Sequence, residues 1–499
     1  MMLKQSWRER PLWALVVLVL MLGGLYMPAE IYPGDPVTMR EETRAILLHG
    51  ELAVEEIVAI NYRQVGEAGQ YVVDNPRNGR SYSKYGSMAA WMYLLPMGAE
   101  LLIEGKLPPF GSPIQVVYLN VFNIVISVLV AASIYRTARR FDAGPWKAAL
   151  FVAICFYTTF LWNYLRAQNS EIIQLLFFAW AVTGFLDTVD ERRNGGVRRW
   201  ALHRMWAACA ALFLTKVSYV FIGPLFAMGL LIDRIGREGS SWWTALCAEA
   251  RHHVVPCGLM IGFWAMLNWV KFGHPLLTGY HRWKPEQHGL HGSLLDSLPP
   301  LLSSAQWGFV VCFPVLAIAL PWMARWLRTK PAEYGTIFGI AIVYLILIGM
   351  LPSWHGAWCY GPRYWIFILP FVALPAIGTF DWLQTRTRAA LLTGCLIALV
   401  LWCSAWLQMQ VNRFPFFAYY QLTGPLAEVS TPAKDAFFGT NTYGWIEYSM
   451  WRCRHRLERL RWWAEIKATS PAEAVAWYEQ EVRNILGRSN LFLFPNREE

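Results

Sequence analysis

The feature that most constrains this chain is the series of long apolar runs spread along most of its 499 residues. A transmembrane helix needs about 17–25 consecutive residues that are mostly apolar. Runs of this kind lie near 11–28, 113–135, 147–163, 171–188, 253–270, 305–324, 335–352, 363–380 and 388–408. Another stretch, 201–232, is too long for one crossing and is interrupted by Lys216, so we divide it into two short spans. The sequence therefore predicts an all-α polytopic membrane protein with about eleven transmembrane helices.

A shorter apolar run, Met88–Ile103, carries Glu100 and is expected to lie on the membrane surface or to be re-entrant. The topology depends on this run not spanning the membrane. The Lys- and Arg-rich connections then all fall on one side, and that side is the cytoplasmic one because cytoplasmic loops carry an excess of positive charge. We therefore expect the N-terminus in the cytoplasm and the C-terminus on the opposite side. The basic segments are the N-terminus and the connections near 136–147, 192–204, 234–251, 325–330 and 386–388.

This topology divides the chain into a transmembrane domain, residues 1–408, and an external tail, residues 409–499. The longest connection, 28–112, becomes a first external loop that carries interfacial helices. The N-terminal apolar run lacks a convincing small-residue cleavage site, so it is expected to remain as the first helix.

Composition excludes several classes of protein and partner. A net charge of +10 would favour nucleic acid in a soluble protein, but in a membrane protein Lys and Arg mark the cytoplasmic ends of helices. We therefore expect no nucleic-acid partner. The nine cysteines include no CxxC pair and no spacing suited to zinc. Cys359 and Cys453 fall in expected external segments, and whether they form a disulfide stays open.

Acidic residues in two external segments are candidates for chemistry. A carboxylate in a surface loop is usually an ordinary solvated charge. Asp35 fits that interpretation less well, because it lies directly past the first span, between Gly34 and Pro36. Glu171 follows the long run 147–163, where it either caps the next helix or faces Asp35 across a cavity, and the two interpretations have about equal weight.

Three cations lie on the same expected face. Lys216 interrupts an apolar stretch, and a charge at that depth is usually functional or paired unless it snorkels to the surface. Lys84 precedes the surface helix, and Arg363 begins a span. Lys and Arg at a lipid–water boundary suit a lipid phosphate, either that of a specific ligand or that of ordinary anionic headgroups.

The ordered set of these features resembles the C-type membrane glycosyltransferases, which include protein O-mannosyltransferases and the aminoarabinose transferases of lipid A. The most specific pieces are Tyr-Ser-Lys-Tyr-Gly at 82–86, the shaped segment Asn268–Tyr280, and Gly-Pro-Arg-Tyr at 361–364. The similarity covers roughly residues 2–380 as an order of features. It implies an enzyme that takes a sugar from a polyprenyl-phosphate donor on the non-cytoplasmic face and transfers it to an acceptor hydroxyl.

The resemblance also implies roles for individual residues. Asp35 matches the first-loop carboxylate that acts as the catalytic base, and Glu171 matches the acidic residue of the second external loop. The residues that match donor-phosphate positions are Lys84, Lys216 and Arg363, with Tyr280 as a further contact.

The chain departs from the family pattern at the first acidic position. The usual Asp-Glu pair is replaced by Asp35-Pro36, and Glu41 and Glu42 follow six and seven residues later, so either of them could be the base instead. Some relatives use a divalent metal, but Asp35 and Glu171 alone are too few ligands to predict one, and the metal stays open.

Other functions remain to be separated from the enzyme by experiment. A transporter or flippase of lipid-linked sugars would place ionisable groups near the bilayer midplane on repeated halves, and no repeat is evident here. A ligase-like or polymerase-like enzyme would carry its largest external loop late in the chain, and a non-catalytic scaffold is a further alternative. The sequence identifies neither the sugar, hexose or pentose, nor the acceptor, which could be lipid, glycan or protein. The resemblance alone suggests a bacterial inner membrane.

Overall fold

The computed structural model describes most of the first 412 residues. The described ranges are 2–28, 35–54, 72–107, 113–166, 168–195, 200–283, 289–303, 308–352, 354, 361–385 and 387–412. Cys359, Cys453 and nearly all of the expected external tail lie outside these ranges, so the question of their disulfide stays open.

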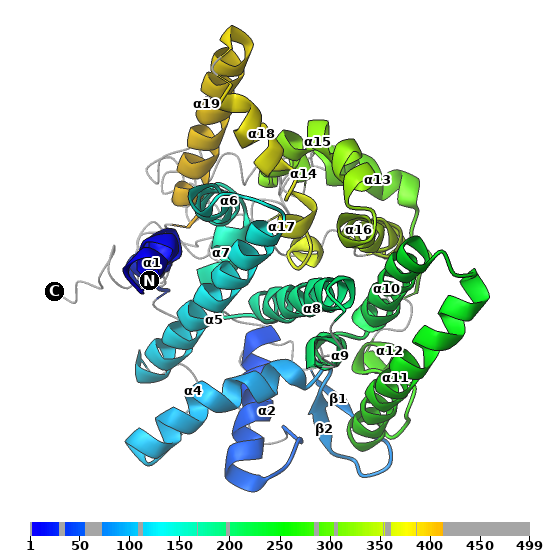
Figure 1. Cartoon of the computed structure of the whole chain (residues 1–499). Coiled ribbons are helices and arrows are strands. Elements are labelled where there is room, and N and C mark those ends of the chain that lie inside the picture. The colour runs from blue at the N-terminus through cyan, green and yellow to red at the C-terminus, as the bar shows by residue number, and fades with distance from the viewer. Residues whose placement is uncertain are drawn as a thin grey trace, which may run out of the picture.

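The described residues form helices and one small antiparallel hairpin (Figure 1). The elements up to the first 3-10 helix are α1 (Met2–Leu25), α2 (Asp35–His49), β1 (Val72–Asp74), β2 (Ser81–Ser83), α4 (Met88–Glu104), α5 (Pro113–Arg140), α6 (Pro145–Tyr157), α7 (Leu161–Arg166), α8 (Ser170–Arg193), α9 (Trp200–Thr215) and η2 (Val217–Phe221).

The second half of the described chain combines the longest helix, α11 (Trp242–Phe272), with several short elements. Its elements are α10 (Ile222–Glu238), α11, α12 (Gly279–Trp283), α13 (Leu294–Ser303), α14 (Phe309–Cys312), α15 (Val315–Thr329), α16 (Glu333–Gly349), η4 (Arg363–Trp365), α17 (Leu369–Val372), α18 (Ala376–Leu383) and α19 (Arg388–Val411).

Five helical segments of the described chain are long and apolar enough to cross a membrane. They are Ile114–Arg140, Ser170–Arg193, Val217–Glu238, Trp242–Phe272 and Arg388–Met409. Two shorter apolar helices, Pro145–Tyr157 and Glu333–Gly349, accompany them. The chain is an integral membrane protein, while the count of eleven spans and the sidedness stay predictions.

The division of the stretch 201–232 at Lys216 is confirmed. α9 ends at Thr215, Lys216 has an extended backbone with φ −156°, and η2 leads directly into α10. The charged side chain thus lies at a helix break instead of in the middle of a span.

Three other apolar runs are not continuous helices, contrary to the simplest reading of them as spans. The run 147–163 is divided between α6 and α7. The run 363–380 is divided into η4, α17 and α18, with Pro370 in the first turn of α17 and Pro375 at the N-cap of α18. The run 305–324 is interrupted at Phe313-Pro314, between α14 and α15. Proline lacks the backbone N–H that a continuing helix requires and is favoured where a new helix begins.

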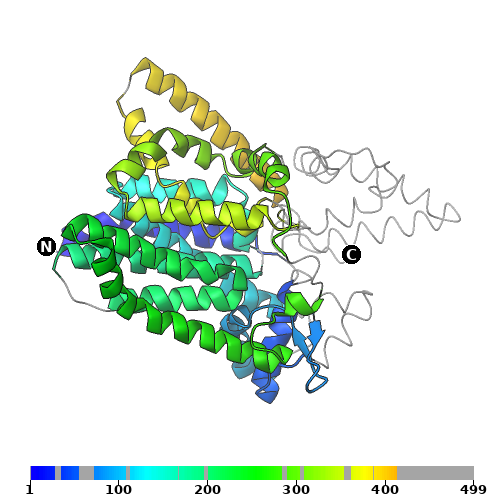
Figure 2. The same ribbon diagram turned by 90° about the vertical axis from the view of Figure 1, so that its right-hand side faces the viewer.

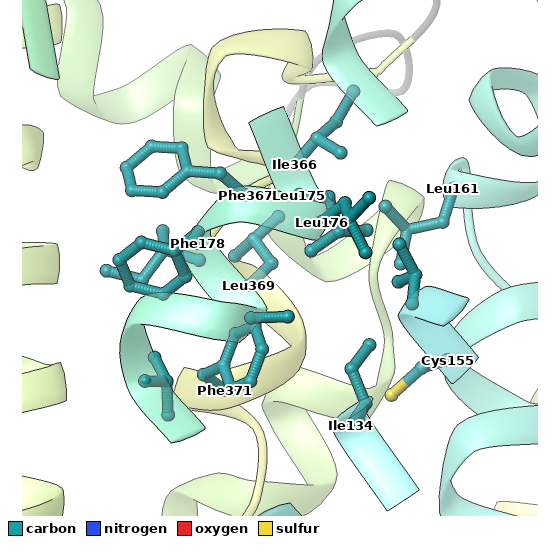
Figure 3. Close-up of a cluster of buried hydrophobic side chains, with 14 of the residues drawn as sticks. Ile134, Cys155, Leu161, Leu175, Leu176, Phe178, Ile366, Phe367, Leu369 and Phe371 are labelled. Carbon is teal, nitrogen blue, oxygen red and sulfur yellow. The ribbon is translucent and has the colours of Figure 1, made fainter. Parts of the chain in front are cut away.

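The core of the bundle is built around α8. In α8, 83% of the most apolar 18-residue segment is buried, compared with 11% of the corresponding segment of α19. Figure 1 shows α8 surrounded by neighbouring helices. The ring of Phe178 lies edge-on to Phe367 and Phe371, with ring centroids 4.9 and 5.3 Å away (Figure 3). Since α8 begins at Ser170, this core fixes the position of Glu171 in its first turn.

The two ends of the helical bundle carry different elements. The N-terminus lies at one end, and α2, the hairpin and α12 lie toward the other (Figure 2). In the hairpin, Val73 pairs with Tyr82, and the chain runs from β2 through Lys84 into α4. α4 itself buries Glu100 and exposes Leu102 and Ile103, so apolar side chains face outward near its C-terminal end.

Candidate active site

Asp35 is the first residue of α2, where its negative charge is favoured by the helix N-terminus. The hydroxyl of Tyr85 donates a hydrogen bond to its Oδ1 atom. Its other oxygen, Oδ2, lies 4.0 Å from Nη2 of Arg363. The carboxylate is therefore held on one side by a hydroxyl and faces a guanidinium on the other.

Arg363 lies between the two predicted acidic residues. Its Nε atom is 3.8 Å from Oε1 of Glu171, in addition to the contact with Asp35. The turn before it requires glycine, because Gly361 has φ +72° and a Cβ there would lie 2.3 Å from the Phe160 ring. Close packing of this turn against Phe160 thus sets where Arg363 begins its 3-10 helix.

Glu171 lies at the start of α8, and the charged group that its carboxylate faces is Arg363 and not Asp35 directly. A negative charge is favoured in this first turn of the helix. Glu171 is buried, so its charge is held in the protein interior and not in bulk solvent.

Lys216 turns back onto the residue after Arg363. Its Nζ atom lies 3.8 Å from the centroid of the Tyr364 ring, a cation–π contact. A snorkelling lysine would place this ammonium in the headgroup region. The contact with Tyr364 brings it instead to the segment that carries Arg363.

Lys84 is positioned by close backbone packing. A Cβ built on Gly279 would lie 2.4 Å from Cα of Lys84, so only glycine allows these two segments to approach. The Nζ atom of Lys84 lies 5.7 Å from the Tyr280 ring, which itself meets the Tyr85 ring edge-on at 6.0 Å. Burial raises the pKa of Tyr280 well above its usual range, so its hydroxyl keeps its proton and can donate to an anion.

Glu41 and Glu42 lie in buried ion pairs with other partners. Glu41 accepts a hydrogen bond from Arg40 at 2.5 Å, and Glu42 accepts one from Lys271 at 2.9 Å. The structure thus brings Asp35 and Glu171 to one arginine and directs Glu41 and Glu42 toward different cations.

A cavity of about 250 Å³ adjoins this group of charges. Its walls are mainly apolar and come from η2, α12, α16 and the segment near 290, with Leu347, Ile348 and Leu351 among them. Lys216, Tyr280 and Tyr364 also line it. The cavity therefore combines an apolar interior with a cationic, hydroxyl-bearing wall.

Two residues of this region were given no role by the sequence analysis. Tyr85 lies inside the segment 82–86, but only the fold shows that its hydroxyl reaches Asp35. Lys271 lies at the end of the run 253–270, where a basic residue reads as an ordinary helix terminus. Its place next to the Gly273–Pro275 loop is the one sequence signal that could have marked it.

The described residues contain no group of three or more His, Cys, Asp or Glu side chains that could hold a metal ion. Asp35 and Glu171 face Arg363, so within this part of the chain they approach a guanidinium.

Comparison with known proteins gives fold-level matches only. No family model and no curated protein matches the sequence. Among solved structures, ArnT from Cupriavidus metallidurans bound to undecaprenyl phosphate is similar, with TM-score 0.52 and 14% identity over 94% of this chain and 84% of ArnT. The archaeal oligosaccharyltransferase AglB from Archaeoglobus fulgidus, in complex with an inhibitory peptide and a dolichol-phosphate, has TM-score 0.53 and 12% identity over 86% of this chain and 59% of AglB.

The chain has the fold of the C-type membrane glycosyltransferases. The resemblance noted in the sequence is thereby confirmed for the architecture. At 12–14% identity the match does not transfer residue roles, so these depend on the geometry described above.

Proposed function

We propose that the protein is a membrane glycosyltransferase that moves a sugar from a polyprenyl-phosphate donor to an acceptor hydroxyl on the non-cytoplasmic face. The observation that carries this proposal is Arg363, which lies between the carboxylates of Asp35 and Glu171 beside an apolar cavity lined by Lys216. A lipid phosphate has the two properties that this arrangement matches, an apolar chain and an anionic head.

The donor lipid suits the cavity and its cationic wall. The isoprene units next to the phosphate would occupy the apolar space along Leu347, Ile348 and Leu351. The phosphate would meet Lys216, Arg363 and Lys84, with the protonated hydroxyl of Tyr280 as a further donor. Fixed cations that neutralise a leaving phosphate supply electrostatic stabilisation where negative charge develops.

Asp35 is the proposed base. It takes the proton of the acceptor hydroxyl while the acceptor oxygen forms a bond to the anomeric carbon. The bond between that carbon and the phosphate oxygen breaks, and polyprenyl phosphate leaves with one more negative charge. A single displacement of this kind inverts the anomeric centre. Glu41 and Glu42 are less suited, because both are buried in ion pairs with Arg40 and Lys271.

The proposal also includes the side of the membrane on which the site lies and the division of the chain into domains. The site lies at the end of the bundle away from the N-terminus (Figure 2). With a cytoplasmic N-terminus in a bacterial inner membrane, that end faces the periplasm, as does the tail 409–499. Residues 1–408 then form the catalytic domain, with the loop 28–112 contributing Asp35 and Lys84.

The test is sugar transfer by purified protein from a radiolabelled polyprenyl-phosphate sugar. We expect release of sugar to an acceptor, and we expect Asp35→Asn to lower the rate by about 10²–10⁴-fold, as loss of a general base does. Asp296→Asn, which changes an exposed carboxylate on α13, is the matched control and should keep the wild-type rate. Full activity in Asp35→Asn would reject the base, and movement of the lipid-linked sugar without transfer would favour a flippase.

A further inference from the structure

Lys271 makes three hydrogen bonds that join separate parts of the chain. Its Nζ atom donates to Oε2 of Glu42 at 2.9 Å, to the backbone carbonyl of Tyr85 at 2.8 Å and to Oγ of Ser87 at 3.2 Å. An ammonium group has three protons, so these bonds use all of them. Lys271 is therefore a junction between α2, the segment before α4 and the end of α11.

The ion pair of Lys271 with Glu42 is almost fully buried, with side-chain exposures of 2% and 1%. Burying two charges costs several kcal/mol per ion, and the attraction within a buried pair often only offsets that cost. The presence of this buried pair is therefore poorly explained by a gain in the stability of the folded protein. It fixes the relative placement of the elements that carry its two members.

The geometry connects this pair to Asp35 by two routes. Glu42 is seven residues after Asp35 on α2, which is two helical turns, so both side chains lie on about the same face. Tyr85, whose carbonyl Lys271 holds, donates its hydroxyl to Asp35. Lys271 therefore fixes both the helix that carries the carboxylate and the residue that donates to it.

A further contact keeps α2 in register with the next helix. The Thr43 hydroxyl donates to the Ala90 carbonyl on α4 at 2.8 Å. The helix is thereby held along its length while the hydrogen bond from Tyr85 is made at its first residue.

We propose that Tyr85, held by the buried Lys271–Glu42 pair, is a positioning residue that aims the Asp35 carboxylate at the reacting hydroxyl. This inference rests on the proposed function, in which Asp35 is the base. Asp35 is the catalytic residue, and the three others act through it.

The first experiment compares kcat and KM for sugar transfer in Tyr85→Phe. This change removes only the hydroxyl, so donor KM should stay within about threefold while kcat falls by about 10–100-fold, as a misaligned reacting group causes. Glu51→Gln is the matched control, because Glu51 and Arg80 form an exposed ion pair in the same part of the chain. The control should keep both constants, and a wild-type kcat in Tyr85→Phe would overturn the inference.

The second experiment separates positioning from folding. Lys271→Met leaves the Glu42 charge buried alone, so both the unfolding temperature and kcat should fall. Adding Glu42→Gln removes that orphan charge, so the double variant should recover the unfolding temperature while kcat stays about 10-fold or more below wild type. Recovery of kcat together with stability would show a purely structural pair and overturn the inference.

A third measurement does not depend on transfer. In a double-mutant cycle of Asp35→Asn and Tyr85→Phe, the shifts of the unfolding midpoint should be non-additive because the two side chains are bonded. Additive shifts would reject the inference even for an inactive protein. Absence of transfer by the wild type, or full activity in Asp35→Asn, would instead reject the proposed function.

Discussion

Two groups of charged residues, at opposite ends of the helical bundle, are arranged differently. At the end that holds the N-terminus, Arg192 donates to both oxygens of Glu249 at 2.9 and 3.0 Å, and Arg193 and Arg237 both reach Asp233 at 2.9 Å. At the other end, Arg363 lies 3.8 and 4.0 Å from two carboxylates, beyond hydrogen-bond distance for these pairs.

The difference separates charges that fasten helices from charges that can receive a substrate. The bonded pairs connect α8, α10 and α11 through groups that satisfy one another, and Glu333 of α16 extends them. The wider contacts of Arg363 adjoin a cavity and the cations Lys84 and Lys216. In the proposed function, this is the region where the phosphate of the donor lipid would bind.

The largest expected effect is on the rate when Arg363 is changed to Met. Loss of a cation that stabilises the leaving phosphate should lower kcat by about 10³-fold. Arg363→Lys keeps the charge without the planar fork and should retain part of the rate. Arg234→Met, at the other end of the bundle, is the control. An Arg363→Met rate within threefold of wild type would remove the distinction between the two ends.

The second prediction concerns stability at the N-terminal end. Glu249 is buried and contacts Arg192, Arg234 and His253, so Glu249→Gln should destabilise the protein by about 3 kcal/mol. The turnover of the folded fraction should stay unchanged, as measured by activity normalised to folded protein. A change in kcat with unaltered stability would contradict a purely fastening role.

The third prediction tests the contact of Lys216 with Tyr364. Lys216→Met should lower transfer by about 10²-fold and weaken protection by polyprenyl phosphate against heat unfolding. Lys330→Met is the control, because Lys330 pairs with Asp142 at a partly exposed site. Undiminished protection of Lys216→Met by the lipid would place the phosphate elsewhere.

The smallest effect is a pH-dependent change at Glu100 on α4. Burial raises the pKa of this carboxyl, opposed by a hydrogen bond from Gln115 and by Arg40. The folded state thus favours the protonated form, so its contribution is present below the ordinary value of 4.5 and is lost as pH rises through the folded pKa. Glu100→Gln should raise the unfolding temperature at pH 8 but not at pH 4, and an equal shift at both would contradict this sign.

Parts of the fold could be predicted from charged residues, because the free energy of burying a charge in the membrane is high. Lys216 marks the break between α9 and α10, because a charge at membrane depth is expensive unless the helix ends there. The broken run 363–380 was harder to predict, since its hydropathy suits a span and its division depends on Pro370, Pro375 and packing around α8.

The site could be predicted as a set of charges but not as a set of pairs. Asp35, Glu171 and Arg363 lie far apart in the sequence, and the nearest two, Asp35 and Glu171, are separated by 136 positions. Residues at such separations cannot be paired from the sequence alone, so it does not show which cation each carboxylate faces. The choice among Asp35, Glu41 and Glu42 stayed open for the same reason, because it depends on where Lys271 and Arg40 lie in space.

The size of the apolar cavity has a consequence for the lipid donor of the proposed function. About 250 Å³ is slightly below the usual size of small-ligand sites, about 300–1,000 Å³, and would hold only the part of a polyprenyl chain next to its head. Recognition is then local, and the remainder of the chain stays among the bilayer lipids. Donors of different chain lengths should therefore be used at similar rates, and short water-soluble analogues should serve as substrates in detergent.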